Sequence, residues 1–147
     1  MFLMLVASLS ASAQTGLKIN ELFQGRIIPQ ERMVETRVRG KTLERYQLTY
    51  YRSLRFNATE EEADRLMQLV EDDGKGYFAT GTEKSQWTSF GREHTHTFKT
   101  QVRKQGDKNC FLCYQVLWRG NTSERRVTVI YLEGTVASLE QLEELLK

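Results

Sequence analysis

The stretch FLCYQVLWRGNTSERRVTVIYL, residues 111–132, decides the fold. Both of its ends are rich in β-branched and aromatic residues, which favour strands, and a Gly-Asn-Thr-Ser break at 120–123 separates them. So short a connection joins two strands as an antiparallel hairpin, because a parallel pair needs a crossover of about a dozen or more residues. We therefore expect strands near 111–118 and 127–132 that pair with one another.

The segments before this hairpin extend the same pattern. Apolar and polar residues alternate at 33–39 and 48–56, and β-branched and aromatic residues recur at 77–83 and 95–103. Short connections again favour hairpins over crossovers. We expect an α+β fold: a mostly antiparallel sheet of about four to six strands with helices packed on one face.

Helices are expected at both ends of the chain and in its middle. A capping box, in which Thr59 and Glu62 satisfy each other's backbone N–H, opens the clearest helix, and the Asp-Asp-Gly at 72–74 stops it. Residues 138–141 carry a similar signal for a final helix that packs back onto the sheet. Shorter helical segments are expected at 19–24 and 42–46.

Length and composition fit one globular domain. The chain has 147 residues, of which 39% are hydrophobic and 27% charged, so it can bury a core and does not belong to the disordered class. Its net charge of +2 indicates no particular partner. Basic residues gather at 26–55, but acidic residues are dispersed among them, which is typical of a solvated sheet face. We expect no nucleic-acid partner.

The first residues have the features of a secretory signal peptide. An apolar run at 2–6 precedes the small-x-small pattern at 11–13, which signal peptidase would cut before Gln14. The segment is too short to span a membrane, which takes about 20 apolar residues. We expect residues 1–13 to be removed and residues 14–147 to form one exported domain, periplasmic or extracellular, soluble and without stable membrane insertion.

Cys110 and Cys113 have the Cys-x-x-Cys spacing of redox and metal sites. Redox pairs owe their low thiol pKa to a helix N-terminus, whereas this pair lies in a segment that reads as a strand. Strand positions three apart point to opposite faces with Cα atoms about 10 Å apart, too far for a disulfide. We expect two unpaired thiols, one of them buried; a disulfide or redox pair is the alternative, and it requires Cys110 to lie in the turn.

His94 and His96 are the candidate metal ligands, because alternate residues of a strand share a face. A zinc or copper site needs a third ligand, and Glu93 has the wrong parity to supply one. Two surface histidines on a sheet face are the preferred interpretation, and we expect no cofactor.

Signatures of an active site are missing from the sequence. It has no Gly-x-Ser-x-Gly elbow, no complete phosphate loop and no carboxylate pair that can be nominated as acid and base. We therefore favour a protein without enzymatic activity. The alternatives are a metal-binding or thiol-redox accessory protein and a small hydrolase.

Trp87 is the main candidate for binding. Polar and glycine residues surround it at 81–86 and 88–91, which indicates a loop, and a tryptophan in a loop either plugs the edge of the core or stacks on a partner. Helices on one face would leave the other sheet face free. We expect binding through that face and the Trp87 loop, with Arg52, Tyr50 and Arg119 as further contacts.

The C-terminal part resembles a known group of proteins. VIYLEG at 129–134, followed by SLxxL at 138–142, looks like the ending of small exported Bacteroidetes proteins of unknown function, and LT at 48–49 and RSL at 52–54 are similar too. The resemblance covers most of the chain after the leader. It implies export, an α+β fold and a bacterial envelope setting, and it offers no catalytic residues. We expect an envelope binding domain whose partner is another envelope protein or a surface glycan.

Overall fold

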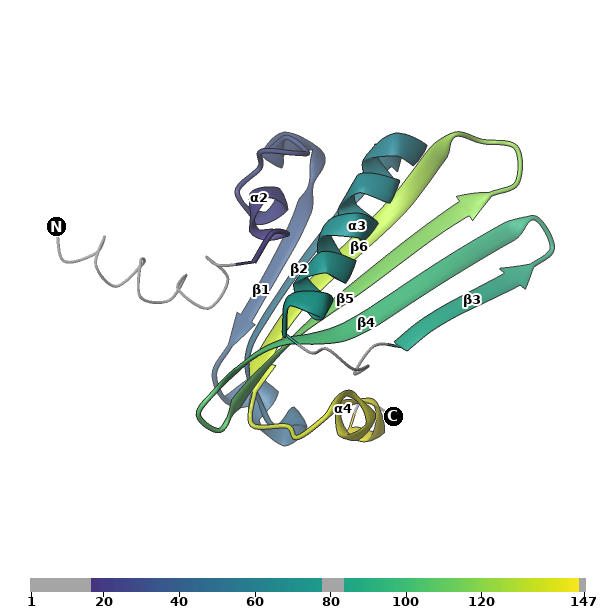
Figure 1. The fold of residues 1–147 in the computed structure, drawn as a ribbon. Helices are drawn as coiled ribbons and strands as arrows, with labels where there is room; N and C mark the ends of the chain where they lie inside the picture. Colours follow the sequence, from purple (N-terminus) through teal and green to yellow (C-terminus); the bar gives the residue numbers. More distant parts are fainter. Residues whose placement is uncertain (1–16, 78–83, 146–147) are drawn as a thin grey trace, which may run out of the picture.

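A six-stranded sheet organises the molecule. A computed structural model describes residues 17–77 and 84–145, and in it the strands pair in the order β1-β2-β6-β5-β4-β3 (Figure 1). Every neighbouring pair is antiparallel, so the predicted α+β fold is confirmed. The strands are β1 (Val34–Arg39), β2 (Leu48–Thr59), β3 (Lys84–Phe90), β4 (Glu93–Gln105), β5 (Lys108–Arg119) and β6 (Glu124–Gly134).

Within the described residues, five helical segments accompany the sheet. They are α2 (Asn20–Phe23), the 3-10 turns η1 (Gln30–Arg32) and η2 (Lys41–Tyr46), α3 (Glu60–Tyr77) and α4 (Leu139–Leu145). The helical segments predicted at 19–24 and 42–46 are confirmed as α2 and η2. Within the described ranges, no helix combines the length and the hydropathy that crossing a membrane requires.

α3 begins where the sequence predicts. The backbone N–H of Thr59 donates to Glu62 Oε1 at 2.9 Å, and the N–H of Glu62 donates to Thr59 Oγ1 at 3.2 Å. The predicted capping box is therefore formed. The predicted stop at 72–74 is wrong, because α3 continues to Tyr77.

Asp73 and Gly74 serve tertiary contacts instead of ending the helix. The Asp73 carboxylate accepts the backbone N–H groups of Lys18, at 2.7 Å, and Ile19, at 2.9 Å, and so ties the start of the described chain to α3. A Cβ at Gly74 would lie 2.5 Å from Thr100 Oγ1, so glycine lets α3 approach β4. Both roles involve residues far away in sequence, which a local stop signal does not reveal.

The larger core lies between α3, α2 and one side of the sheet, called here the α3 face. Alternate strand residues such as Leu54, Leu112 and Val129 point to this face and are fully buried. Tyr114 donates its hydroxyl hydrogen to the Ala63 carbonyl at 2.8 Å, which fixes α3 over β5. This packing matches the expectation of helices that cover one side of the sheet.

A smaller core lies on the opposite side, called here the open face. Leu139 and Leu142 of α4 pack with Phe111 and Leu132, whose side chains point away from α3. The helices therefore do not all lie on one face, and α4 crosses to the other at one end of the sheet (Figure 1). The predicted N-terminal signal of this helix is confirmed, because the N–H of Gln141 donates to Ser138 Oγ.

β3 differs from the prediction. It spans Lys84–Phe90, whereas a strand was expected at 77–83; Tyr77 belongs to α3, and residues 78–83 lie outside the described residues. Trp87 lies in the middle of β3, opposite His96, so its assignment to a loop was wrong. The serines and threonine around it suit an exposed edge strand as well as a loop, and the sequence pattern did not separate the two.

Candidate functional site

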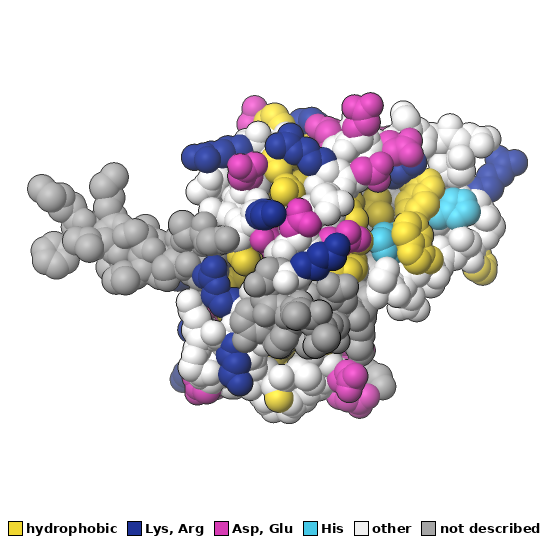
Figure 2. All heavy atoms as spheres, viewed as in Figure 1, with side chains coloured by type: hydrophobic (Ala, Val, Ile, Leu, Met, Phe, Trp, Pro, Cys, Tyr) yellow, Lys and Arg dark blue, Asp and Glu magenta, His cyan; other side chains and the backbone are white. Residues whose placement is uncertain are grey.

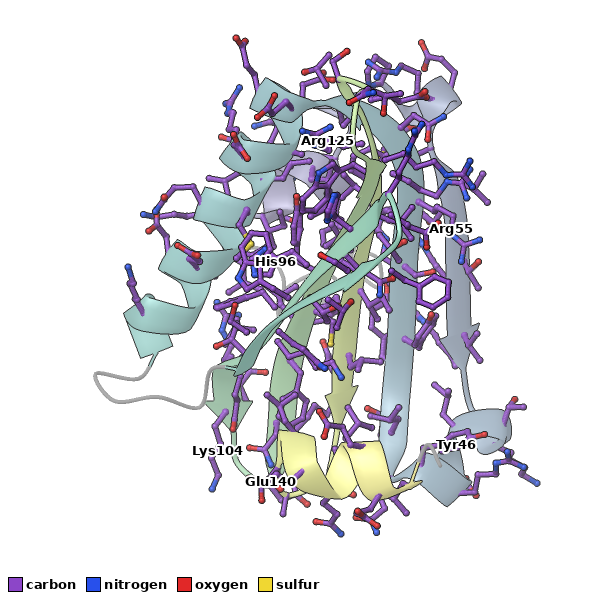
Figure 3. All side chains as sticks on the ribbon, turned by 90° about the vertical axis from the view of Figure 1, so that its right-hand side faces the viewer. Tyr46, Arg55, His96, Lys104, Arg125 and Glu140 are labelled. Carbon is purple, nitrogen blue, oxygen red and sulfur yellow. The ribbon has the colours of Figure 1, made fainter. Side chains whose placement is uncertain are left out.

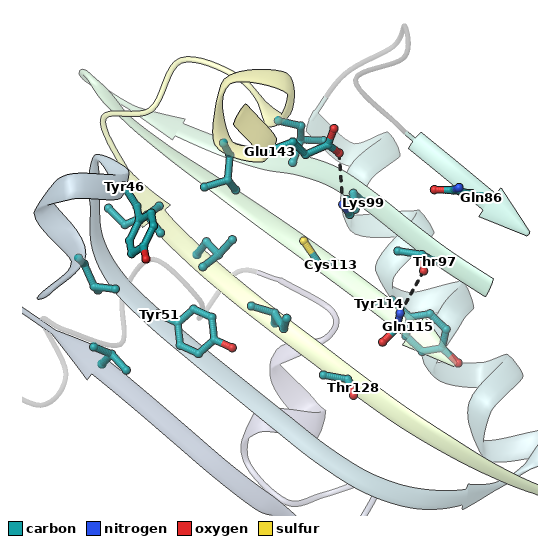
Figure 4. Close-up of a pocket in the computed structure, with 17 residues that line it drawn as sticks. Tyr46, Tyr51, Gln86, Thr97, Lys99, Cys113, Tyr114, Gln115, Thr128 and Glu143 are labelled. Atoms are coloured by element: carbon teal, nitrogen blue, oxygen red, sulfur yellow. Dashed lines mark hydrogen bonds and ion pairs between the residues drawn. The ribbon is translucent and has the colours of Figure 1, made fainter. Parts of the chain in front are cut away.

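A deep cavity lies on the open face, between η2 and α4 (Figure 4). We call it the open-face pocket. It has a volume of about 560 Å³ and is lined mainly by apolar side chains. α4 and η2 cover only one end of this face, so the pocket opens onto the remaining part of the sheet.

Three strands form the floor of the pocket, and the two helical segments form its walls. Cys113 of β5 and Ile130 of β6 are cross-strand partners, and Tyr51 of β2 lies diagonally from Ile130; all three are half-buried. The apolar residues of the walls and of the adjoining floor are Val38, Leu43, Tyr46, Leu48, Leu132, Leu139 and Leu142. Their arrangement produces a concave surface that no described segment fills.

The charged and amide groups of the pocket lie on one side, and the hydroxyls of Tyr46 and Tyr51 lie on the other (Figure 4). Lys99 Nζ and Glu143 Oε1 are 3.2 Å apart and join β4 to α4, and Gln115 donates to Thr97 Oγ1 at 3.4 Å (Figure 4). Thr128 and, at the edge, Gln86 of β3 add further polar groups. The pocket thus has an apolar interior and a border of charged and amide groups on one side, a combination typical of sites for small molecules.

The cysteines carry no activated thiol. Cys113 lines the pocket, and burial raises the pKa of its thiol to about 11, so it stays protonated near neutral pH. Cys110 points to the α3 face, and burial raises the pKa of its thiol as well. Both cysteines are free, so the prediction of two unpaired thiols, one of them buried, is confirmed.

Arg52 and Tyr50 lie on the α3 face and away from the pocket. Arg52 is buried, and one of its terminal nitrogens donates to the Phe23 carbonyl and to Glu35 Oε2, both at 3.1 Å. Burial alone would raise the pKa of Glu35, but the neighbouring arginines outweigh this and lower it. The half-buried ring of Tyr50 packs edge-on against Tyr131. These contacts stabilise the fold and leave Arg52 little surface for a ligand.

Trp87, His94 and His96 come together on the α3 face, beyond the edge of α3. Trp87 stacks on His96 with ring centroids 3.6 Å apart and lies edge-to-face with Trp118 at 6.2 Å. A groove of about 320 Å³ separates these rings from α3, and we call it the α3–β3 groove. Arg119 lies apart from the groove, at the C-terminal end of β5, and its Nε is 3.9 Å from Glu93 Oε2.

The metal alternative finds no complete ligand set. His96 Nε2 is 2.9 Å from Ser85 Oγ, and His94 Nδ1 is 2.8 Å from Ser89 Oγ, so each imidazole already bonds to β3. Within 17–77 and 84–145, no group of three His, Cys, Asp or Glu side chains could hold a metal ion.

The Ser85–His96 contact is the strongest structural hint of hydrolase chemistry. A catalytic histidine is oriented by a third group, usually a carboxylate, that bonds to its second nitrogen. In the described part of the chain, no carboxylate is hydrogen bonded to either imidazole. The serine–histidine pair is therefore best explained as a cross-strand bond that holds β3 to β4.

The comparison with protein families gives one match. The model of a family of unknown function, DUF6108, matches residues 6–146, nearly the whole chain. The chain belongs to DUF6108. No curated protein and no solved structure matches this DUF6108 chain. The expectation of a family of unknown function is confirmed.

Sequence reasoning predicted the free face of this DUF6108 sheet and missed the residues that make its pocket. Leu43, Ile130 and Leu142 carried no signal beyond hydrophobicity. Parity would have grouped Tyr51, Cys113 and Ile130 only once the strand register was known. The pocket depends on α4 crossing to the open face, and the leucines of α4 do not specify which face they cover.

Proposed function

We propose that this DUF6108 protein is an exported binding domain without enzymatic activity, and that its open-face pocket holds a small apolar or amphiphilic ligand. The pocket carries the proposal, because its volume of about 560 Å³ lies within the range of about 300–1,000 Å³ usual for ligand sites. The mainly apolar lining favours such a ligand over the surface glycan expected from the sequence.

The polar border supports an amphiphile in particular. Lys99 and Glu143 lie beside the apolar floor, so a polar head group could contact them while an apolar body covers Ile130 and Leu142. The absence of enzymatic activity is supported by the protonated Cys113 thiol and by the pairing of Lys99 with Glu143. Neither group is prepared for nucleophilic attack.

Export and a bacterial envelope setting, in Bacteroidetes, belong to the same proposal. They are supported by the leader-like pattern of residues 1–13 and by the resemblance of 129–134 and 138–142 to exported proteins. Mass spectrometry of the protein secreted or recovered from periplasm should give a chain that begins at Gln14. An intact leader on protein recovered from cytosol would contradict export while leaving the pocket untested.

Binding is tested with 1-N-phenylnaphthylamine, an uncharged apolar fluorophore. We expect saturable fluorescence enhancement with the folded protein and at least about tenfold weaker binding by Ile130→Gln, which places an amide on the apolar floor. Arg55→Gln is the matched control, because Arg55 is exposed on the same sheet face outside the pocket. Thermal unfolding checks that both variants are folded. Equal binding by the two variants would refute the pocket as the site.

A further inference from the structure

The α3–β3 groove is a second site candidate, on the sheet face opposite the open-face pocket. Asp64 and Glu71 of α3 line one side, and Trp87, His96 and Trp118 line the other. Figure 3 shows His96 and Arg125 beside α3, and Figure 2 shows hydrophobic side chains and both histidines gathered next to acidic side chains on this surface. The groove therefore joins aromatic rings to carboxylates.

The aromatic side of the groove is fixed and exposed. Trp87 lies parallel to His96, with an angle of 5° between the rings, and Ser85 holds the imidazole by a hydrogen bond. Although its neighbours fix its orientation, 66% of Trp87 is exposed. A tryptophan held in this way offers a π surface at little cost in side-chain entropy.

The α3 side of the groove is negatively charged. Glu60, Asp64 and Glu71 all line it, since positions four and seven residues apart fall on one face of a helix. Asp64 and Glu71 take part in no ion pair within the described residues. Burial lowers the pKa of His96, so its imidazole adds no positive charge at neutral pH. Arg125 is the basic residue that lines the groove.

Arg125 shows how this groove accommodates a cation. Its guanidinium lies over the Trp118 ring, 5.2 Å from the centroid, and its terminal nitrogen is 3.6 Å from Glu60 Oε2. Trp87, Asp64 and Glu71 offer the same combination of a ring and carboxylates along the rest of the groove. Aromatic rings beside carboxylates are the usual recognition elements for ammonium groups.

We propose that the α3–β3 groove binds a small organic ammonium cation, held by the exposed Trp87 side chain and by the carboxylates of Asp64 and Glu71. The volume of about 320 Å³ fits a small molecule and is at the low end for ligand sites. Charge complementarity selects a cation, and the tryptophan favours an alkylated ammonium over a strongly hydrated metal ion. This proposal is independent of the open-face pocket.

The test uses NMR titration with tetramethylammonium chloride, because the chain has two tryptophans and so gives two indole N–H signals. We expect the Trp87 signal to shift saturably with tetramethylammonium and to stay unchanged with sodium chloride at equal ionic strength. The double variant Asp64→Asn/Glu71→Gln should weaken binding at least about fivefold. Trp87→Leu should weaken it by a similar factor, and there the titration is followed on the remaining Trp118 signal.

Glu61→Gln is the matched control, since Glu61 lies on the same helix, is exposed and does not line the groove. It should bind as the unchanged protein does, and thermal unfolding should show that every variant is folded. Equal shifts with sodium chloride, or unaltered affinity in the Asp64/Glu71 variant, would overturn the proposal. Binding of a lysine peptide without binding of tetramethylammonium would overturn the assignment to a small cation.

Discussion

At the scale of single residues, Gly74 sets how closely α3 approaches the sheet. Alanine usually stabilises a helix interior relative to glycine by about 1 kcal/mol. Here its Cβ would lie 2.5 Å from Thr100 Oγ1, and Thr100 is buried and β-branched, so it cannot move aside. We expect Gly74→Ala to lower the free energy of unfolding by about 1–3 kcal/mol in denaturant titrations. Thr100→Ala in the same chain should restore most of the loss; no recovery would contradict the contact.

His96 makes stability depend on pH. Burial lowers its pKa below the ordinary value of 6.5, so the unfolded chain takes up this proton at a higher pH than the folded one. The contribution of His96 to stability is therefore complete above pH 6.5 and is lost as the pH falls through the folded pKa. We expect His96→Gln to flatten the decline in unfolding free energy between about pH 7 and pH 5. His94→Gln serves as the control and should keep that decline.

At the scale of secondary-structure elements, local signals predicted most of the fold. The capping box at 59–62 and the alternating strands at 33–39 and 48–56 are confirmed because neighbouring residues alone determine them. The predictions for the end of α3 and the position of β3 were wrong, because Gly74 packs against Thr100 across the core and Trp87 pairs with His96 across the sheet. Contacts between residues distant in sequence decide these boundaries, and local sequence patterns do not reveal such contacts.

The capping box gives a prediction for α3 as an element. Thr59→Ala removes the oxygen that accepts the N–H of Glu62, and no other described group replaces it. We expect the free energy of unfolding to fall by about 0.5–2 kcal/mol, measured by chemical denaturation. Glu61→Ala is the neighbouring control, because Glu61 is exposed and outside the box; it should change stability by less than about 0.5 kcal/mol. Similar losses in both variants would contradict a specific role for the cap.

At the scale of the whole molecule, the candidate sites are products of topology. The open-face pocket collects side chains from η2, all six strands and α4, and the α3–β3 groove collects them from α3 and four strands. The sequence predicted a free sheet face and Trp87 as binding elements, and it assigned both to a single binding surface. The register puts Trp87 on the α3 face with His96, so the two sites lie on opposite sides of the sheet.

The two cores share the same strands, which predicts cooperative unfolding. Phe111 and Leu112 are adjacent and fully buried, yet Phe111 packs in the core with α4 and Leu112 in the core with α3. We expect Phe111→Ala to cost about 3–5 kcal/mol and Leu112→Ala about 2–5 kcal/mol, each lowering the midpoint of one shared transition. Circular dichroism reports the whole sheet, while the fluorescence of Trp87 and Trp118 reports the α3 face, so the two probes should coincide in both variants. If the Phe111→Ala variant lost its dichroism at a lower denaturant concentration than its tryptophan signal, the two cores would unfold separately. That result would contradict coupling of the cores through β5.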